Sequence, residues 1–168
     1  MTTLLILALL TTACADSGAS DSGGAKGGPE TVRVELHGKP FTLDLALDEP
    51  TRVKGLSHRE HVAPDQGMLF VFPDPMPLSF VMRHCFVPID IAFLDGAGRV
   101  LVVHEMTVEE PQREGESDFE YENRLRKYDS RFPAQFALET AGGRLRAVGL
   151  KPGDVVPIDV KSLKRRAR

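Results

Sequence analysis

Alternating apolar and polar residues predict an antiparallel hairpin early in the chain. Val32, Val34 and Leu36 alternate with polar residues, and the stretch 41–47 does the same. Gly38 lies between the two runs, so the pattern predicts two strands joined by a tight loop. Further apolar runs predict strands over 68–72, 78–84, 89–94, 99–106, 134–140 and 155–160.

Helix signals separate these runs. Asp48 followed by Pro50 is typical of a helix start. The stretches 57–60 and 117–120 both have the capping-box pattern, in which Ser is followed three residues later by Glu. The second box predicts a helix with three apolar side chains on one face and two ion pairs at i,i+4 spacing: Tyr121, Leu125 and Tyr128, then Glu120–Arg124 and Glu122–Arg126. A helical turn is expected over 144–148, stopped by a glycine.

Strands dominate this pattern and short helices lie between them. The expected fold class is therefore α+β, with a compact β-rich core that is either barrel-like or a curled mixed sheet, and with two to four short helices. Pro157 places the strand expected over 155–160 at an edge of the sheet. The stretch 73–77 holds three prolines, so no regular structure is expected there.

The first residues of the chain have the pattern of an export signal. Residues 4–10 read LLILALL, which is too short to span a bilayer but suits the apolar region of a signal peptide. The small residue Ala13 directly before Cys14 is similar to a bacterial lipobox, although Thr11 stands where a branched apolar residue is usual. We expect a signal peptide over 1–13 and lipid attachment at Cys14. One alternative is cleavage after Ala15, which would release a soluble secreted protein; another is a terminus without function.

The following segment favours the lipoprotein interpretation. Eleven of the sixteen residues from 15 to 30 are Gly, Ser or Ala. We therefore expect a lipidated tether over 14–30 that inserts into a lipid bilayer through Cys14, with the protein facing the periplasm or the cell exterior. One globular domain is expected over 31–160. The tail 161–168 holds five basic residues and no acid, and we expect a solvated end, with anionic headgroups as the alternative.

Composition narrows the class of protein. The chain has 168 residues, 42% of them hydrophobic, and a net charge of −3, which excludes collagen, disordered polyampholytes and polytopic membrane proteins. Because the chain has no net positive charge, nucleic acid is not expected as a partner. The tail carries +5 and residues 14–160 carry −8. Two cysteines, 71 positions apart, build no disulfide framework, so Cys85 is the only thiol of the domain.

Several motifs together resemble the domain-of-unknown-function 192 family. They are Gly55-Leu56, Arg59-Glu60, the run from Ala63 to Pro73, Leu78 to Arg83 without Val81, Ile89 to Asp95, Gly98 to Val100, Tyr128 to Glu139 in part, and Gly149 to Asp154. The resemblance covers roughly residues 31–160. It implies a compact, β-rich, barrel-like α+β domain that often follows a signal peptide in bacteria and archaea. The family has no established activity, cofactor or catalytic residue, so none is carried over.

One departure from the family pattern lies in the middle of the chain. The common pattern F-W-M-K-N-T corresponds here to residues 80–85, which read FVMRHC. Val81 stands in place of the indole, His84 in place of the amide and Cys85 in place of the hydroxyl. The charge is kept by Arg83, as a planar guanidinium.

The pair His84 and Cys85 suggests a thiol nucleophile activated by a neighbouring base. On an extended strand, however, adjacent side chains point to opposite faces, which separates the imidazole from the thiol. A lone cysteine in a strand is more often a small buried apolar residue. We therefore expect Cys85 to be structural.

His58 and His61 are the only candidates for metal ligands. If residues 57–60 begin a helical turn, the two imidazoles share a face at i,i+3 spacing, and His104 or Glu105 could add a third ligand. The spacing fits neither common zinc-protease motif. Two exposed histidines are the favoured interpretation, and neither a metal nor another cofactor is expected.

Four charged residues lie inside apolar stretches: Arg59, Arg83, Asp90 and Glu139. They are either ion pairs that close the core or the lining of a polar pocket. The candidate pocket consists of Arg59, Met82, Arg83, His84, Cys85, Asp90 and Glu139. No catalytic constellation is recognisable, so we expect a membrane-tethered binding or accessory module whose partner is a small polar ligand or an envelope protein. The alternative is a small enzyme or metal protein that uses His84, Cys85 and Asp90, or His58 and His61.

Overall fold

The computed structural model describes residues 28–168. The strands are β1 (Thr31–Leu36), β2 (Lys39–Ala46), β3 (Gln66–Met76), β4 (Ser79–Phe80), β5 (Ile89–Leu94), β6 (Val100–Met106), β7 (Tyr128–Asp129) and β8 (Ala134–Ala141). The helices are α1 (Glu49–Lys54), α2 (Asp118–Arg124), α3 (Arg144–Ala147) and α4 (Val160–Arg166). The predicted signal peptide, the lipidation site Cys14 and nearly all of the predicted tether lie outside the described residues.

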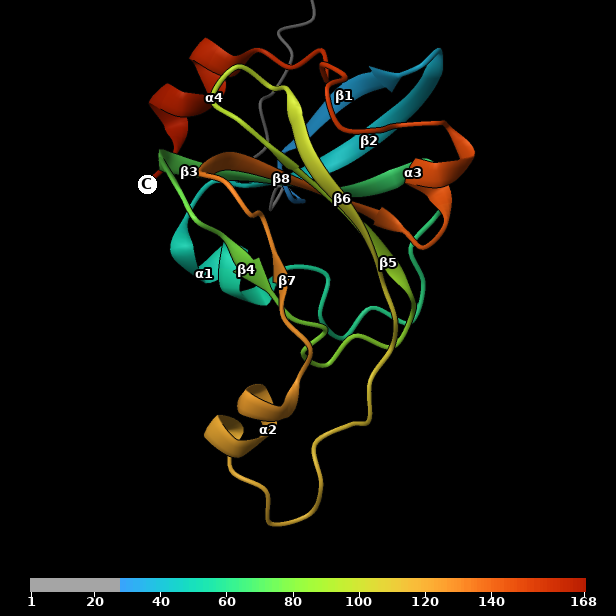
Figure 1. Ribbon diagram of the computed structural model, residues 1–168, viewed down its shortest axis with the longest axis vertical. Coiled ribbons are helices and arrows are strands. Elements are labelled where there is room, and N and C mark those ends of the chain that lie inside the picture. Colours follow the sequence, from blue (N-terminus) through green and yellow to red (C-terminus); the bar gives the residue numbers. More distant parts are fainter. Residues whose placement is uncertain (1–27) are drawn as a thin grey trace, which may run out of the picture.

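Six strands form one mixed, curled sheet in the order β1-β2-β3-β8-β5-β6 (Figure 1). The β2–β3 pair is parallel, with α1 in the connection between the two strands, and all other neighbours are antiparallel. The sheet is open, and β4 and β7 form a separate two-stranded ribbon. The α+β class is confirmed, with the curled sheet rather than a closed barrel.

Both faces of the sheet are covered, which explains the continuous apolar runs of its central strands. Along β8, Phe136 and Leu138 point into one core cluster, while Ala137 points into the other. The first cluster includes Leu145 of α3 and Leu163 of α4. The second cluster is closed by residues of the 56–62 and 78–82 segments, and Glu139 faces this side of the sheet.

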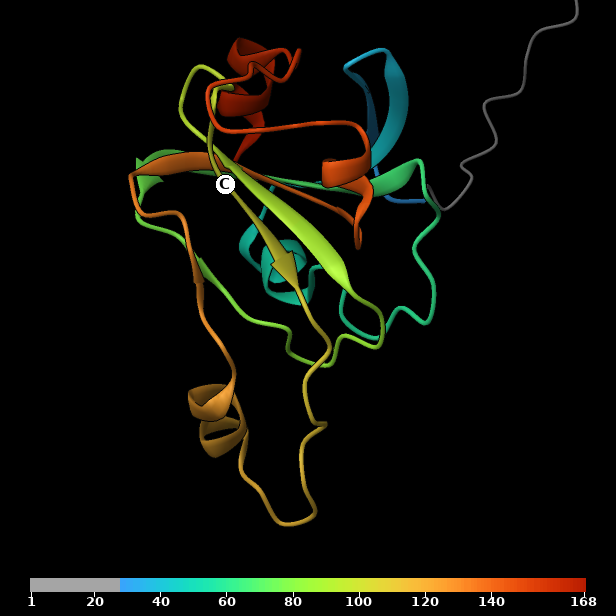
Figure 2. The same ribbon diagram turned by 45° about the vertical axis from the view of Figure 1, so that its right-hand side comes forward.

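Residues 107–127 form an arm that projects from the sheet. In Figure 1 and in the rotated view of Figure 2, the chain leaves β6, runs away from the sheet, forms α2 and returns to β7. Ser117 caps α2 through the predicted capping box with Glu120. The arm is anchored on the core side by Tyr121 and Leu125, which are both buried.

Several predictions from the pattern are confirmed. The early hairpin pairs Thr31–Leu36 with Lys39–Asp44. The side chain of Asp48 caps α1 by accepting a hydrogen bond from the Thr51 amide, with Pro50 in the first turn. Along the described part of the chain, no helix is long and apolar enough to cross a membrane.

Other predicted elements are absent or have different bounds. The stretch 57–60 forms turns instead of a helix, and only Ser79–Phe80 of the 78–84 segment is a strand. Residues 155–160 contribute one isolated bridge, between Arg99 and Val155, and α4 then occupies the tail that was expected to be solvated. Strand β3 continues into the proline-rich stretch because a register shift between Val71 and Met76 accommodates it.

The ion pairs of α2 are also different from those predicted. Glu120 is used by the capping box, and Glu122 pairs with Arg83. Arg124 pairs with Glu116 instead. Helix α2 ends at Arg124, so Tyr128 belongs to β7 rather than to the helix.

Candidate ligand-binding cavity

A cavity of about 360 Å³ opens on the side of the sheet that carries Glu139. This volume lies within the range of small-molecule sites. The cavity is lined by residues of α1, of the turn after it, of β3, of the 79–85 segment, of α2 and of β8: Glu49, Arg52, Val53, Lys54, Gly55, Leu56, Ser57, Phe70, Phe72, Ser79, Phe80, Val81, Arg83, Cys85, Glu122 and Glu139. Aromatic rings and a few charged groups therefore share one concave surface.

Glu139 is the buried acid of this cavity. Its residue is 6% exposed, and within residues 28–168 its carboxyl group forms neither a hydrogen bond nor an ion pair. Burial raises the pKa of Glu139 to about 8, and the opposing effect of the Arg59 guanidinium is smaller. The carboxyl group is therefore largely neutral at pH 7.

The backbone that carries Glu139 is held in place by its neighbours in the sheet. Glu139 pairs with Met68 of β3 and with Ile91 of β5. A Cβ atom at Gly67 would lie 2.0 Å from the Glu139 carbonyl oxygen, so only glycine permits this close approach of β3 to β8. The acid is thus fixed on a central strand rather than on a loop.

Arg83 joins three segments at the wall of the cavity. Its guanidinium donates to Glu122 Oε1 of α2 at 2.5 Å and to the carbonyl of Val53 in α1 at 2.8 Å. The Ser57 hydroxyl donates to the Arg83 carbonyl at 2.8 Å. The guanidinium group and the backbone carbonyl of Arg83 therefore both have partners within the protein.

The other two arginines near the cavity are also engaged. Arg52 donates to the carbonyls of Val71 and Arg168 and lies 5.2 Å from the centre of the Phe72 ring. Arg59 donates to Asp44 Oδ2 at 2.6 Å, which confirms ion pairing for this residue. It lies outside the lining, although its charge acts on Glu139.

Cys85 is a free thiol that lines the cavity. Burial raises its pKa to about 11, with a further contribution from Glu139 that outweighs the opposing effects of Ser57 and Arg83. The thiol is protonated at neutral pH and is a poor nucleophile in this state. Its Sγ atom lies 3.6 Å from the Arg83 carbonyl oxygen.

His84 has a different environment from the one that the sequence predicts. Residues 82–85 form a turn and His84 has a φ of 51°, so the argument from an extended strand does not apply. His84 and Cys85 both border a second cavity, of about 280 Å³, beneath the arm. The imidazole lies between Tyr121 and His58, and its ring centre is 4.9 Å from that of His58.

The histidines at 58 and 61 do not share a helical face. Both are exposed, and His58 is in a left-handed turn with φ 61°. His104, the possible third ligand, bonds instead to the Asp129 carbonyl, and Glu105 pairs with Arg146. Between residues 28 and 168, no three His, Cys, Asp or Glu side chains are grouped so that they could hold a metal ion.

Two further residues of the predicted pocket lie elsewhere. Asp90 is 1% exposed and accepts hydrogen bonds from the amides of Gly143 and Leu145 at the start of α3. Met82 is buried in the second core cluster. The structure thus brings Arg83, Cys85 and Glu139 together and separates Asp90 and Met82 from them.

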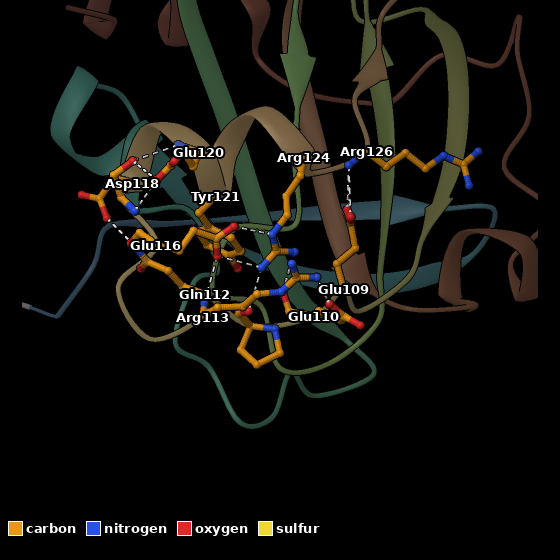
Figure 3. A network of polar contacts seen from close by, with 12 residues as sticks. Glu109, Glu110, Gln112, Arg113, Glu116, Asp118, Glu120, Tyr121, Arg124 and Arg126 are labelled. Atoms are coloured by element: carbon orange, nitrogen blue, oxygen red, sulfur yellow. Dashed lines mark hydrogen bonds and ion pairs between the residues drawn. The ribbon is translucent and has the colours of Figure 1, made fainter.

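The arm, which contributes Glu122 to the cavity lining, is held together by a network of polar contacts (Figure 3). Arg124 bonds to both carboxylate oxygens of Glu116, at 2.6 and 3.0 Å, and lies 4.9 Å from the centre of the Tyr121 ring. The Tyr121 hydroxyl in turn accepts from the His84 amide at 3.2 Å. This chain of contacts positions α2 against the cavity wall.

Sequence reasoning missed the aromatic lining and α1. Phe70 and Phe80 contact each other edge to face, with ring centres 5.0 Å apart, and read in the sequence as ordinary core residues. Only the departure at Val81 could have indicated the cavity from the sequence. Val81 stands where the family pattern has Trp, and it lines the cavity here. A smaller side chain at this position leaves space that an indole would occupy.

Comparisons with solved structures show two similar folds. A protein of Sinorhizobium meliloti, provisionally described as a transcription regulator, is 30% identical, with a TM-score of 0.60; the alignment covers 80% of this chain and 96% of that one. A protein of unknown function from Novosphingobium aromaticivorans is 23% identical, with a TM-score of 0.62 and coverages of 88% and 99%; this likeness concerns the fold alone. No curated protein matches the chain.

A family model also matches most of the chain. The family of uncharacterized ACR proteins, domain of unknown function 192, matches residues 32–158. That range includes every strand of the sheet except the first residue of β1, together with all the residues that line the cavity. The chain therefore belongs to the domain-of-unknown-function 192 family.

Proposed function

We propose that this protein is a membrane-tethered, extracytoplasmic binding module, and that its ligand site is the cavity over Glu139. The observation that carries the proposal is a buried carboxyl group that lines a cavity and has no partner among the described residues. Burial of a polar group without a hydrogen bond is costly, so such a group in a native structure calls for a partner, and a ligand in the adjoining cavity supplies one. The aromatic residues around it supply the apolar surface that small-molecule sites require.

Binding is favoured over catalysis by the state of the reactive groups. The Cys85 thiol is protonated, Asp90 is used to cap α3, and the guanidinium groups of Arg83 and Arg52 are bonded to protein groups. A nucleophile with an adjacent base is not found among these residues. A ligand can be bound between Glu139 and the aromatic residues without such a nucleophile.

The binding proposal is tested by filling the cavity. Full-length protein is incubated with a metabolite mixture and analysed by native mass spectrometry. Val81→Trp places an indole in the cavity, so we expect bound mass in the wild type and its loss in this variant. Val155→Trp is the matched control, because Val155 is 56% exposed and lies away from the cavity. Equal binding by all three proteins would refute the assignment of the site.

The tether is tested separately, by mass spectrometry of the mature N-terminus from bacterial membranes. We expect a diacylglyceryl-modified Cys14 as the first residue, and release of Cys14→Ser protein from the membrane fraction. An unmodified terminus at Asp16 would instead establish a soluble secreted protein.

A further inference from the structure

The chemistry of the cavity also narrows the class of ligand, provided that the proposed binding function holds. Glu139 is the buried acidic group of the lining, and no basic side chain of residues 28–168 bonds to it. Its carboxyl group lies on the central strand β8, buried, with no donor from residues 28–168. A ligand that brings a positive charge to this position would remove the cost of burying an unpaired acid.

The arginines around the cavity already have protein partners, so they do not favour binding of an anion next to Glu139. Arg83 is paired with Glu122 at 2.5 Å, and Arg59 with Asp44 at 2.6 Å. Arg52 donates to two carbonyl groups. Lys54 and Glu49 are both exposed on α1 and carry opposite charges. The rim cations outnumber the rim acids by one, and none of these cations bonds to Glu139.

The walls suit an organic cation better than a hydrated metal ion. Phe70, Phe72 and Phe80 all line the cavity. Aromatic rings attract ammonium groups and also bury an attached hydrocarbon. Gly55 lies against this wall, since a Cβ atom there would come within 3.4 Å of the Phe70 ring.

We propose that the cavity binds a small organic ammonium ion with a short apolar body, whose nitrogen pairs with the Glu139 carboxylate while the apolar body packs against Phe70 and Phe80. The pairing requires ionised Glu139, so the ammonium ion binds as the carboxylic acid releases its proton to the solvent. One proton therefore leaves for each ligand that enters near pH 7.

Proton release gives the proposal a pH signature. Because the pKa of Glu139 is about 8, the affinity should rise roughly tenfold for each pH unit between 6 and 8 and then level off. An alkylammonium ion keeps its charge over this range, as lysine does. The charged groups on this side of the sheet are, besides the Cys85 thiol, two on other strands of the same face, Asp44 with its partner Arg59 and His104. The remaining ones line the cavity: Glu49, Arg52, Lys54, Arg83 and Glu122.

The experiment is isothermal titration calorimetry of the full-length protein with three probes of similar shape: phenethylammonium, 2-phenylethanol and 3-phenylpropionate. We expect the ammonium probe to bind at least tenfold more tightly than the other two at pH 8. When titrated near pH 7 in buffers of different ionisation enthalpy, it should release about one proton per bound ligand. In Glu139→Gln this preference and the pH dependence should disappear. Glu35→Gln is the matched control, because it removes an exposed acid of β1 that lies outside the cavity lining and leaves the buried acid in place.

Failures of the two proposals are distinguishable. If the alcohol or the carboxylate binds as well as the ammonium probe, and Val81→Trp abolishes that binding, the cavity is a binding site but not for a cation. Affinity for the ammonium probe that falls as the pH rises would also overturn the ligand class. If no probe binds and native mass spectrometry finds no ligand blocked by Val81→Trp, the binding function itself is wrong.

Discussion

Glu139 couples the stability of the fold to pH. Its pKa is raised from an ordinary value of 4.5 to about 8, so the folded state holds a proton that the unfolded chain releases. The stability from this group is fully present below pH 4.5 and is lost as the pH rises to about 8. Without ligand, the protein should therefore be less stable at pH 8.5 than at pH 5.

Replacement by an uncharged isostere should remove this dependence. Glu139→Gln is expected to raise the free energy of unfolding at pH 8.5, by on the order of 2 kcal/mol, and to change it little at pH 5. Urea unfolding at the two pH values measures the effect. Glu35→Gln, on an exposed residue of β1, serves as the control. A destabilised Gln variant at pH 8.5 would show that the carboxylate has a partner.

Asp90 illustrates a buried acid with a structural role. Its carboxylate accepts from the Gly143 and Leu145 amides at 2.8 and 2.9 Å and so fixes the turn between β8 and α3. Asp90→Ala leaves both donors unsatisfied and should cost about 3 kcal/mol, whereas Asp90→Asn, which keeps one acceptor, should cost less. Chemical denaturation ranks the variants. Equal stability of Ala and Asn would contradict the capping role.

At the scale of elements, the arm is held by ion pairs as well as by the buried Tyr121 and Leu125. Glu116 accepts from Arg124 and from the Arg113 amide, and these bonds lower its pKa to about 2. The contribution of this carboxylate is therefore present above its ordinary value of 4.5 and is lost as the pH falls towards 2. The arm should loosen in acid before the sheet unfolds.

Glu116→Gln should reproduce this loosening at neutral pH. Amide hydrogen exchange is expected to quicken in residues 107–127 and to remain unchanged in β8 and β5. Glu114→Gln is the control, because Glu114 lies in the same arm, is exposed and takes part in none of the ion pairs of the described residues. Faster exchange throughout the sheet would mean that the arm supports the whole fold rather than itself.

Elements with strong local signals were predictable and those made by tertiary contacts were not. The β1–β2 hairpin and the capping box at Ser117 follow from periodicity and from cap chemistry. The strand predicted over 155–160 is wrong: the apolar pattern there suggests a buried strand, but Val155 is 56% exposed. In α4 only Leu163 is buried, and Val160 and Ala167 pack partly buried against the same core cluster. Three apolar residues among many basic ones give no clear sequence signal for this packing.

At the scale of the molecule, α4 connects the C-terminal segment to the residue that precedes β1. Arg166 pairs with Glu30 at 2.5 Å, and Leu163 packs into the first core cluster. Leu163→Ala should cost about 3 kcal/mol, as truncations in a core do. Thermal or urea unfolding measures it, with the exposed Lys161→Ala on the same helix as control. Similar stabilities for the two variants would show that α4 is not part of the core.

The cavity could be predicted only in part because distant segments build it. Arg83, Cys85 and Glu139 could be proposed from charge and reactivity within apolar stretches. Arg52 and Glu122 come from helices whose docking no local pattern specifies. Asp90 gave the same sequence signal as Glu139, and the two differ only because Asp90 meets the amides of α3 across the sheet.

The position of β8 has a consequence for how the chain folds. This strand lies between β3 and β5, yet it comes from the last quarter of the sequence. Until residues 134–141 arrive, β3 and β5 each present an unpaired edge, which is the usual starting point for aggregation. Because Glu139 belongs to β8, the insertion that closes these edges also completes the cavity, and a chain that lacks β8 has neither a continuous sheet nor this cavity.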